Sequence, residues 1–181
     1  MNIVRASHAD EYLLSFWTRE SRPGKNGEFP PPQERMNRIL GKFPYKFPCE
    51  GNKEISWHIG EITSVPELGQ LWRIRDEWLR KWDIVEWSHW LKDLAEIVQK
   101  GKFFEQPKND QGSVRDNYDR WKAAGTLKGV LDDHEKPLLV KYPHFTAIAD
   151  GWGRLLPYHV LVNEGLEFQP FQVYLAVPLN T

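Results

Sequence analysis

Alternating apolar and polar residues predict a strand near residue 60, and short apolar runs predict further strands in the C-terminal part of the chain. Residues 54–65 place apolar side chains at alternating positions, which is the period of a strand with one buried face. After Pro137, two short runs rich in apolar residues, 138–142 and 145–150, flank a Pro-His turn and predict a hairpin. Residues 171–177 are strongly apolar and predict a final strand.

Other segments carry apolar residues at helical intervals. Ser64-Val-Pro-Glu67 has the spacing of a capping box with proline just inside the helix start, and apolar side chains follow from Leu68 to Trp82. The box spacing recurs at Asp83–Glu86, ahead of an apolar stripe from Trp87 to Val98 that stops at Gly101. We also expect helices over residues 114–124 and 155–163, ended by Gly125 and Gly165, with a turn or short helix at 126–131.

Residues 1–53 differ in character from the rest. Six prolines and four glycines between residues 23 and 51 exclude a long helix or a central strand there. Aromatic residues in the same stretch favour an ordered arm over a flexible tail, because disordered segments are poor in them: Phe29, Phe43, Tyr45 and Phe47. We predict an irregular Pro-rich N-terminal arm over residues 1–53. A single domain follows over residues 54–181, with a Trp-rich helical insert at about 66–131 and an α+β or mixed α/β fold.

Composition narrows the classes of protein that the chain can belong to. The 181 residues carry 24 Lys and Arg against 25 Asp and Glu, so contact with DNA would need a local basic patch. A single cysteine, Cys49, excludes an internal disulfide and a multi-cysteine zinc site. No apolar run approaches the ~20 residues that span a bilayer, so we expect a cytoplasmic protein without a membrane span.

The most informative motif is Asp150-Gly-Trp-Gly-Arg154, which lies between a predicted strand and a predicted helix. Gly151 and Gly153 permit a positive φ or a close approach to a ligand. The unpaired amides of a helix's first turn, with Arg154 beside them, would form a cradle for a phosphate. The alternative is a tight turn in which Arg154 pairs with a nearby carboxylate.

These motifs resemble the ParB/sulfiredoxin superfamily. Pro137–Val140 is similar to its Pro-Ile/Leu-Val strand, and Ile148–Arg154 to its G-x-x-R loop. The helix ended by Gly165 and the strand Val173–Val177 complete the similarity. The resemblance covers residues 54–177 loosely and 137–177 well, and it implies an α+β fold with a small mixed sheet.

In that superfamily the G-x-x-R loop holds the phosphates of ATP or CTP, which would fall here to Gly151, Trp152, Gly153 and Arg154. The chain departs from sulfiredoxins, whose loop has a catalytic Cys and a His where this sequence has Trp152 and Gly153. It also departs from chromosome-partitioning ParB proteins, because Leu155 replaces a second Arg and four residues follow Val177 in the given sequence, so we do not expect site-specific centromere binding. The chain resembles small plasmid-encoded fertility-inhibition proteins of the Osa type, which consist of the fold core and little else. The resemblance then implies ATP hydrolysis and DNA cleavage in a bacterial cytoplasm.

Several side chains are candidates for the chemistry of such an enzyme. Asp150 would hold Mg²⁺ or a water, or else cap the loop amides. Glu61 is a candidate general base, or else the start of the helix-capping turn. His159 would lie near a phosphate or at the edge of the core. Weaker candidates, which we expect to be solvated or structural, are His58, His144, Asp132, Asp133 and Glu135.

Three functions are therefore open. The first is an enzyme that binds ATP or another nucleotide with Mg²⁺, cleaves DNA, and suppresses conjugative or T-DNA transfer through a type IV secretion system. The second is a non-catalytic protein that docks its Trp-rich helices and its Pro-rich arm on a secretion or replication component. The third is a DNA-binding module without turnover, using the basic strip Arg73, Arg75, Arg80 and Lys81. Helical spacing favours core or interface packing for the tryptophans, and the sequence specifies no oligomeric state.

Overall fold

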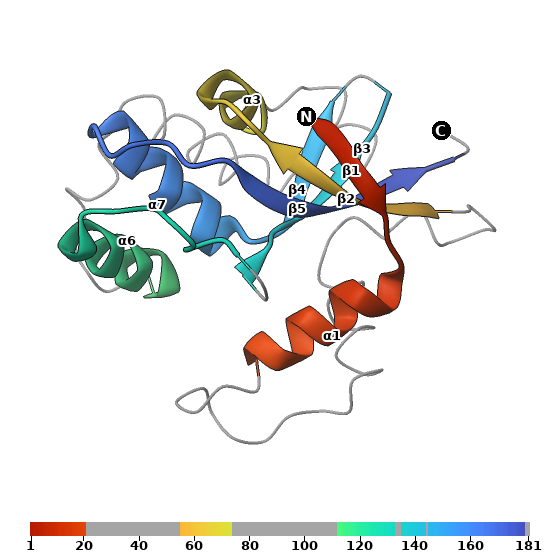
Figure 1. Cartoon of the computed structure of the whole chain (residues 1–181), viewed down its shortest axis with the longest axis horizontal. Coiled ribbons are helices and arrows are strands. Elements are labelled where there is room, and N and C mark those ends of the chain that lie inside the picture. The colour runs from red at the N-terminus through yellow and green to blue at the C-terminus, as the bar shows by residue number, and fades with distance from the viewer. Residues whose placement is uncertain (21–54, 74–111, 133–134, 144, 180–181) are drawn as a thin grey trace, which may run out of the picture.

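The computed structural model describes residues 1–20, 55–73, 112–132, 135–143 and 145–179 (Figure 1). Its elements, in chain order, are β1 (Asn2–Ala6), α1 (Ala9–Glu20), β2 (Ile55–Ile62), α3 (Val65–Gln70), α6 (Gly112–Ala124), β3 (Leu138–Lys141), β4 (Thr146–Asp150), α7 (Trp152–Asn163) and β5 (Phe171–Pro178). No helix among these described residues is long and apolar enough to cross a membrane.

The strands form one five-stranded mixed sheet in the order β1-β2-β5-β3-β4. β5 lies at its centre, antiparallel to β2 from Ile55↔Pro178 to Ile62↔Phe171 and parallel to β3. β3 and β4 form the predicted antiparallel hairpin. The prediction of an α+β fold with a mixed sheet is confirmed, and the finer assignment to the ParB/sulfiredoxin fold stays a prediction.

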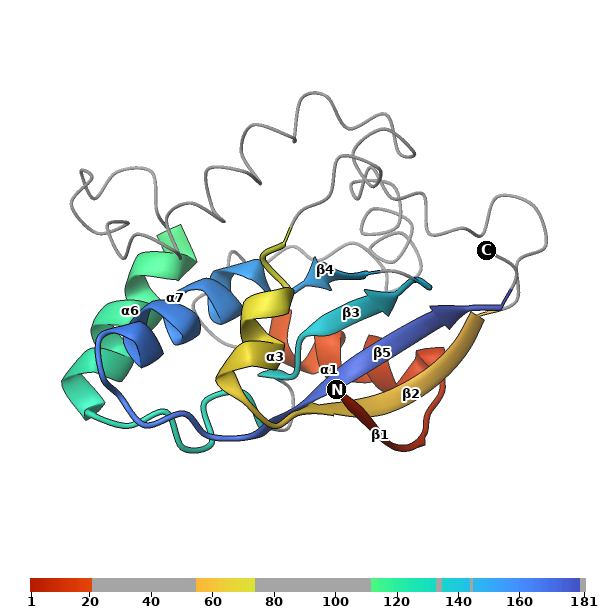
Figure 2. The same cartoon turned by 90° about the horizontal axis from the view of Figure 1, so that it is seen from above.

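Helices pack on both faces of the sheet, because the central strands are apolar on both faces. In β5, Val173 and Leu175 face the cluster that α3, α6 and α7 complete, whereas Tyr174 and Ala176 face the cluster that receives Tyr12 of α1. Figures 1 and 2 show α1 on one side of the sheet and α3 on the other. This two-sided burial is typical of a strand at the centre of a mixed sheet.

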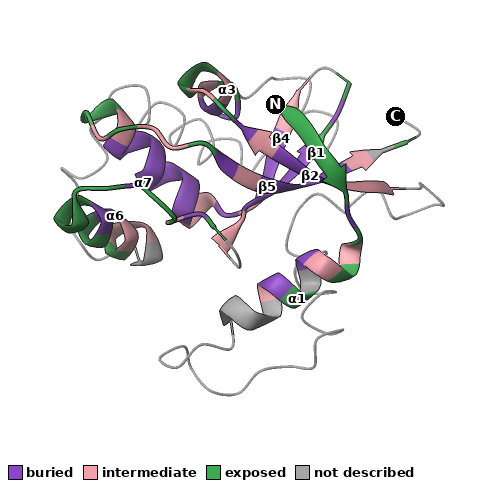
Figure 3. Ribbon diagram, viewed as in Figure 1, coloured by how far each residue is buried: buried purple, intermediate pink, exposed green. Residues whose placement is uncertain are grey.

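α7 is the most deeply buried helix among the described residues. Every residue from Arg154 to Leu161 is buried, as the continuous purple of this helix in Figure 3 shows. α6 covers its outer side with Tyr118 and Trp121, and the Asn117 side chain donates a hydrogen bond to the Gly153 carbonyl at 2.8 Å. The first turn of α7 is therefore enclosed by α6 as well as by the sheet.

At the start of α3 the Ser64 cap forms as the sequence predicts, but the second bond of the predicted capping box does not, because the Glu67 carboxylate accepts from the Thr63 amide instead of the Ser64 amide. The helix is also shorter than predicted. Ser64 has an extended backbone and its hydroxyl accepts a bond from the Glu67 amide at 3.4 Å. The helix ends at Gln70, so the predicted continuation to Trp82 is wrong at residues 71–73, which form a turn. Trp72 packs in the core without being helical. The predicted helix over residues 87–98 lies outside the described residues.

The prediction of an irregular arm from residue 1 is wrong for the first 20 residues. β1 pairs with β2 at the edge of the sheet, and α1 follows it. Residues 1–20 contain no proline or glycine, which begin at Pro23, so treating residues 1–53 as one segment hid two regular elements. The arm beyond residue 20 lies outside the described residues.

Most remaining element predictions are confirmed. α6 ends before Gly125, which has a φ of +66°, and Gly165 follows α7 with a φ of +103°. Residues 128–131 form a turn, as one of the two predicted alternatives states. α7 begins at Trp152, three residues before the predicted start, because Gly151 lets the chain turn directly from β4 into the helix.

Candidate functional site

The Asp150-Gly-Trp-Gly-Arg154 motif forms a close-packed corner between β4 and α7. Gly151 caps the helix with a φ of +105°, and its carbonyl accepts bonds from the amides of Arg154 and Leu155 at 3.0 and 2.8 Å. A Cβ atom at Gly151 would lie 2.9 Å from the Pro137 Cβ and 3.1 Å from the Arg154 Nη2. Two features therefore require glycine at position 151: the positive φ and the close contact with Pro137.

The Arg154 guanidinium is buried and held by two acidic residues. Its Nη2 donates to the Asp150 Oδ2 at 2.9 Å, and its Nη1 donates to the Glu135 carbonyl at 2.7 Å. The Glu135 Oε2 lies 3.5 Å from the same Nη1, and only 8% of the Arg154 side chain is exposed. One guanidinium thus faces two carboxylates.

This arrangement matches the alternative that the sequence left open, a turn whose arginine pairs with nearby carboxylates. A nucleotide phosphate needs donors whose positive charge is not already neutralised. The predicted cradle residues come together at the corner, but the Arg154 donors point to Asp150 and Glu135. The corner as it stands does not fit a phosphate of ATP at Arg154.

The predicted role of Asp150 as a Mg²⁺ ligand meets the same difficulty. Its Oδ2 accepts the Arg154 bond across the corner between β4 and α7. No three His, Cys, Asp or Glu side chains gather as a metal-binding group in the part of the chain that the structure describes. The geometry therefore assigns Asp150 an ion pair, and its metal role stays a prediction.

Glu61 and Asp150 do not share a site. Glu61 is half-buried in β2 and pairs in register with Asn2 and Gln172. β5 and β3 lie between β2 and β4, which corresponds to about 14 Å across the sheet. A single bound phosphate could not contact both carboxylates, so the pairing of these two residues in one catalytic centre is not supported.

His159 is a core residue rather than a solvent-accessible base. It is 6% exposed, its Nδ1 is buried without a hydrogen-bond partner, and its ring lies 6.2 Å from that of Trp72. Burial lowers the pKa of His159 to about 4, so the imidazole is neutral at neutral pH. Of the weaker candidates, His58 bonds the Ser56 hydroxyl at 2.7 Å, and Asp133 and His144 lie outside the described residues.

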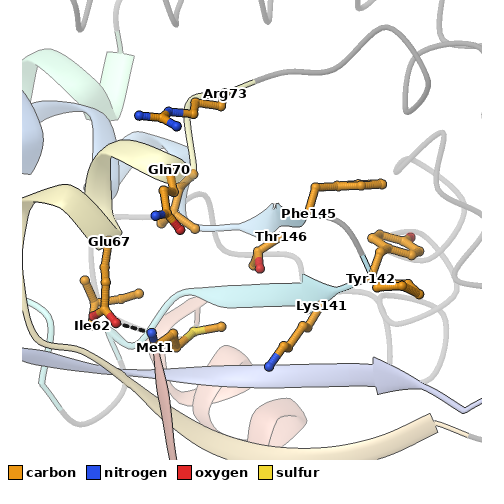
Figure 4. Close-up of a pocket in the computed structure, with 11 residues that line it drawn as sticks. Met1, Ile62, Glu67, Gln70, Arg73, Lys141, Tyr142, Phe145 and Thr146 are labelled. Atoms are coloured by element: carbon orange, nitrogen blue, oxygen red, sulfur yellow. Dashed lines mark hydrogen bonds and ion pairs between the residues drawn. The ribbon is translucent and has the colours of Figure 1, made fainter.

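A cavity of about 330 Å³ lies at the hairpin end of β3 and β4, which is the end away from the corner at Arg154 (Figure 4). It is bordered by the start of β1, by the end of β2, by the α3 segment and by the β3–β4 hairpin. Its lining residues are Met1, Ile62, Glu67, Gln70, Leu71, Arg73, Lys141, Tyr142, Pro143, Phe145 and Thr146. The sequence analysis missed it because four separate segments supply its walls. The nearest signal was the predicted hairpin turn, which placed Lys141 and Thr146 side by side.

Comparisons of the chain with protein-family models, with curated proteins and with solved structures find no match. The ParB/sulfiredoxin resemblance stays a prediction that rests on the motifs of residues 137–177.

Proposed function

We propose that this chain is a non-catalytic interaction protein with a ParB/sulfiredoxin-like core. In the setting that the resemblance suggests, it suppresses conjugative or T-DNA transfer by contacting a component of a type IV secretion or replication system. The observation that carries the proposal is the pairing of buried Arg154 with Asp150 and Glu135. This pairing gives the motif a structural role in place of a phosphate-binding one.

The physical argument is one of charge. Catalysis of phosphoryl transfer relies on an excess of positive charge around the phosphate. At the corner, an incoming phosphate would meet two carboxylates and would have to displace both from Arg154. The ion pairs instead join three segments, namely the residues before β3, the end of β4 and the first turn of α7.

The exposed apolar side chains of the N-terminal elements favour a protein partner. β1 is an edge strand of the described sheet, and its Ile3 and Val4 are 51% and 49% exposed. Leu14 of α1 is 65% exposed. An edge strand with apolar side chains is a template for pairing with a strand of another protein. Trp72, one of the tryptophans of the predicted docking helices, cannot contact a partner, because it is 2% exposed and packs against Trp152.

The test compares suppression of plasmid transfer by a set of variants. Asp150→Asn combined with Arg154→Gln removes both charges of the ion pair together, which a folded core tolerates better than loss of the arginine alone. We expect this double variant to fold and to keep suppression. We expect Val4→Lys to lose it, while Ala123→Lys, the same type of change at an exposed position of α6, keeps it.

Assays of ATP hydrolysis and DNA cleavage with Mg²⁺ complete the experiment. The proposal requires that the purified wild-type protein show neither activity. If the folded double variant loses suppression and the wild-type protein hydrolyses ATP or cleaves DNA, the proposal of an interaction protein would give way to that of a nucleotide-dependent nuclease. Suppression that survives Val4→Lys would exclude the β1 edge as the contact.

A further inference from the structure

We draw no further inference here: the strongest candidate, the half-buried pair of Ser56 and His58 on one face of β2, whose hydroxyl and Nε2 lie 2.7 Å apart, carries none, because no carboxylate among the described residues bonds the imidazole and the pair does not line the cavity of Figure 4.

Discussion

Replacement of Gly151 by alanine tests the close packing of the corner between β4 and α7. Gly151 has a φ of +105°, and an added Cβ would lie 2.9 Å from the Pro137 Cβ and 3.2 Å from its Cα. Gly165, after α7, has nearly the same φ of +103°, but an added Cβ there would meet no atom within 4 Å. The two glycines thus share the backbone conformation and differ in the contact, which makes Gly165→Ala a matched control.

The expected magnitudes follow from these two terms. A positive φ costs an alanine about 1–2 kcal/mol, and this term acts at both positions. Forcing a methyl group against a buried, packed neighbour costs about 1–3 kcal/mol more, and this term acts only at Gly151. We expect Gly165→Ala to lower the free energy of unfolding by about 1–2 kcal/mol and Gly151→Ala by about 2–5 kcal/mol.

Urea unfolding followed by tryptophan fluorescence measures both values, provided that the dependence on urea concentration is the same in the three proteins. The difference between the variants isolates the contact with Pro137. If Gly151→Ala costs no more than Gly165→Ala, the segment before β3 does not pack on the corner. The account of Arg154 as a structural residue would then lose its basis, because that segment also supplies Glu135.

Three further predictions concern other parts of the core. The unfolded chain protonates His159 near its ordinary pKa of 6.5, but the folded chain does so only at about 4. The free energy of unfolding is therefore not reduced by His159 above pH 6.5, and it falls by up to about 1.4 kcal/mol per pH unit as the pH drops towards 4. Urea unfolding at several pH values should show a shallower fall for His159→Leu. Equal slopes would contradict the burial of the ring. The Tyr158 hydroxyl donates to the Gln169 carbonyl at 2.6 Å and accepts from its amide at 3.0 Å, so Tyr158→Phe should lower the free energy of unfolding by about 1–3 kcal/mol, whereas no loss would show that water replaces the bonds. Ser64→Ala should cost about 0.5–1 kcal/mol in the same assay, because it removes the cap of α3, while Ser64→Gly should cost only a few tenths; equal costs would show that the hydroxyl does not cap.

Local patterns in the sequence predicted much of the fold. Alternation identified β2, two apolar runs around a Pro-His turn identified the β3–β4 hairpin, and glycine placement identified the ends of α6 and α7. β1 was missed because all five of its residues are exposed, so its sequence carries no alternation. The length of α3 was overestimated because the helical spacing of Leu68, Leu71 and Trp72 reflects shared burial in the core, which a turn satisfies as well as a helix.

The candidate site was harder to predict, because its outcome depends on tertiary contacts. Gly151 and Arg154 were identified from the motif, and their positions at a strand-to-helix corner are as expected. The second partner of Arg154 was not predictable, since Glu135 lies 19 residues away in sequence and reaches the guanidinium only through the path of the chain before β3. A nearby carboxylate and a bound phosphate require the same local pattern, so sequence alone left both open.

The central position of β5 has a consequence for biosynthesis. β1 and β2 form one half of the described sheet and the β3–β4 hairpin forms the other, and β5 is the strand that joins them. During translation both halves leave the ribosome before β5, so each presents an open edge while the chain is still being made. Premature termination before residue 171 would release two unjoined pieces of sheet prone to aggregation, instead of a slightly shortened protein.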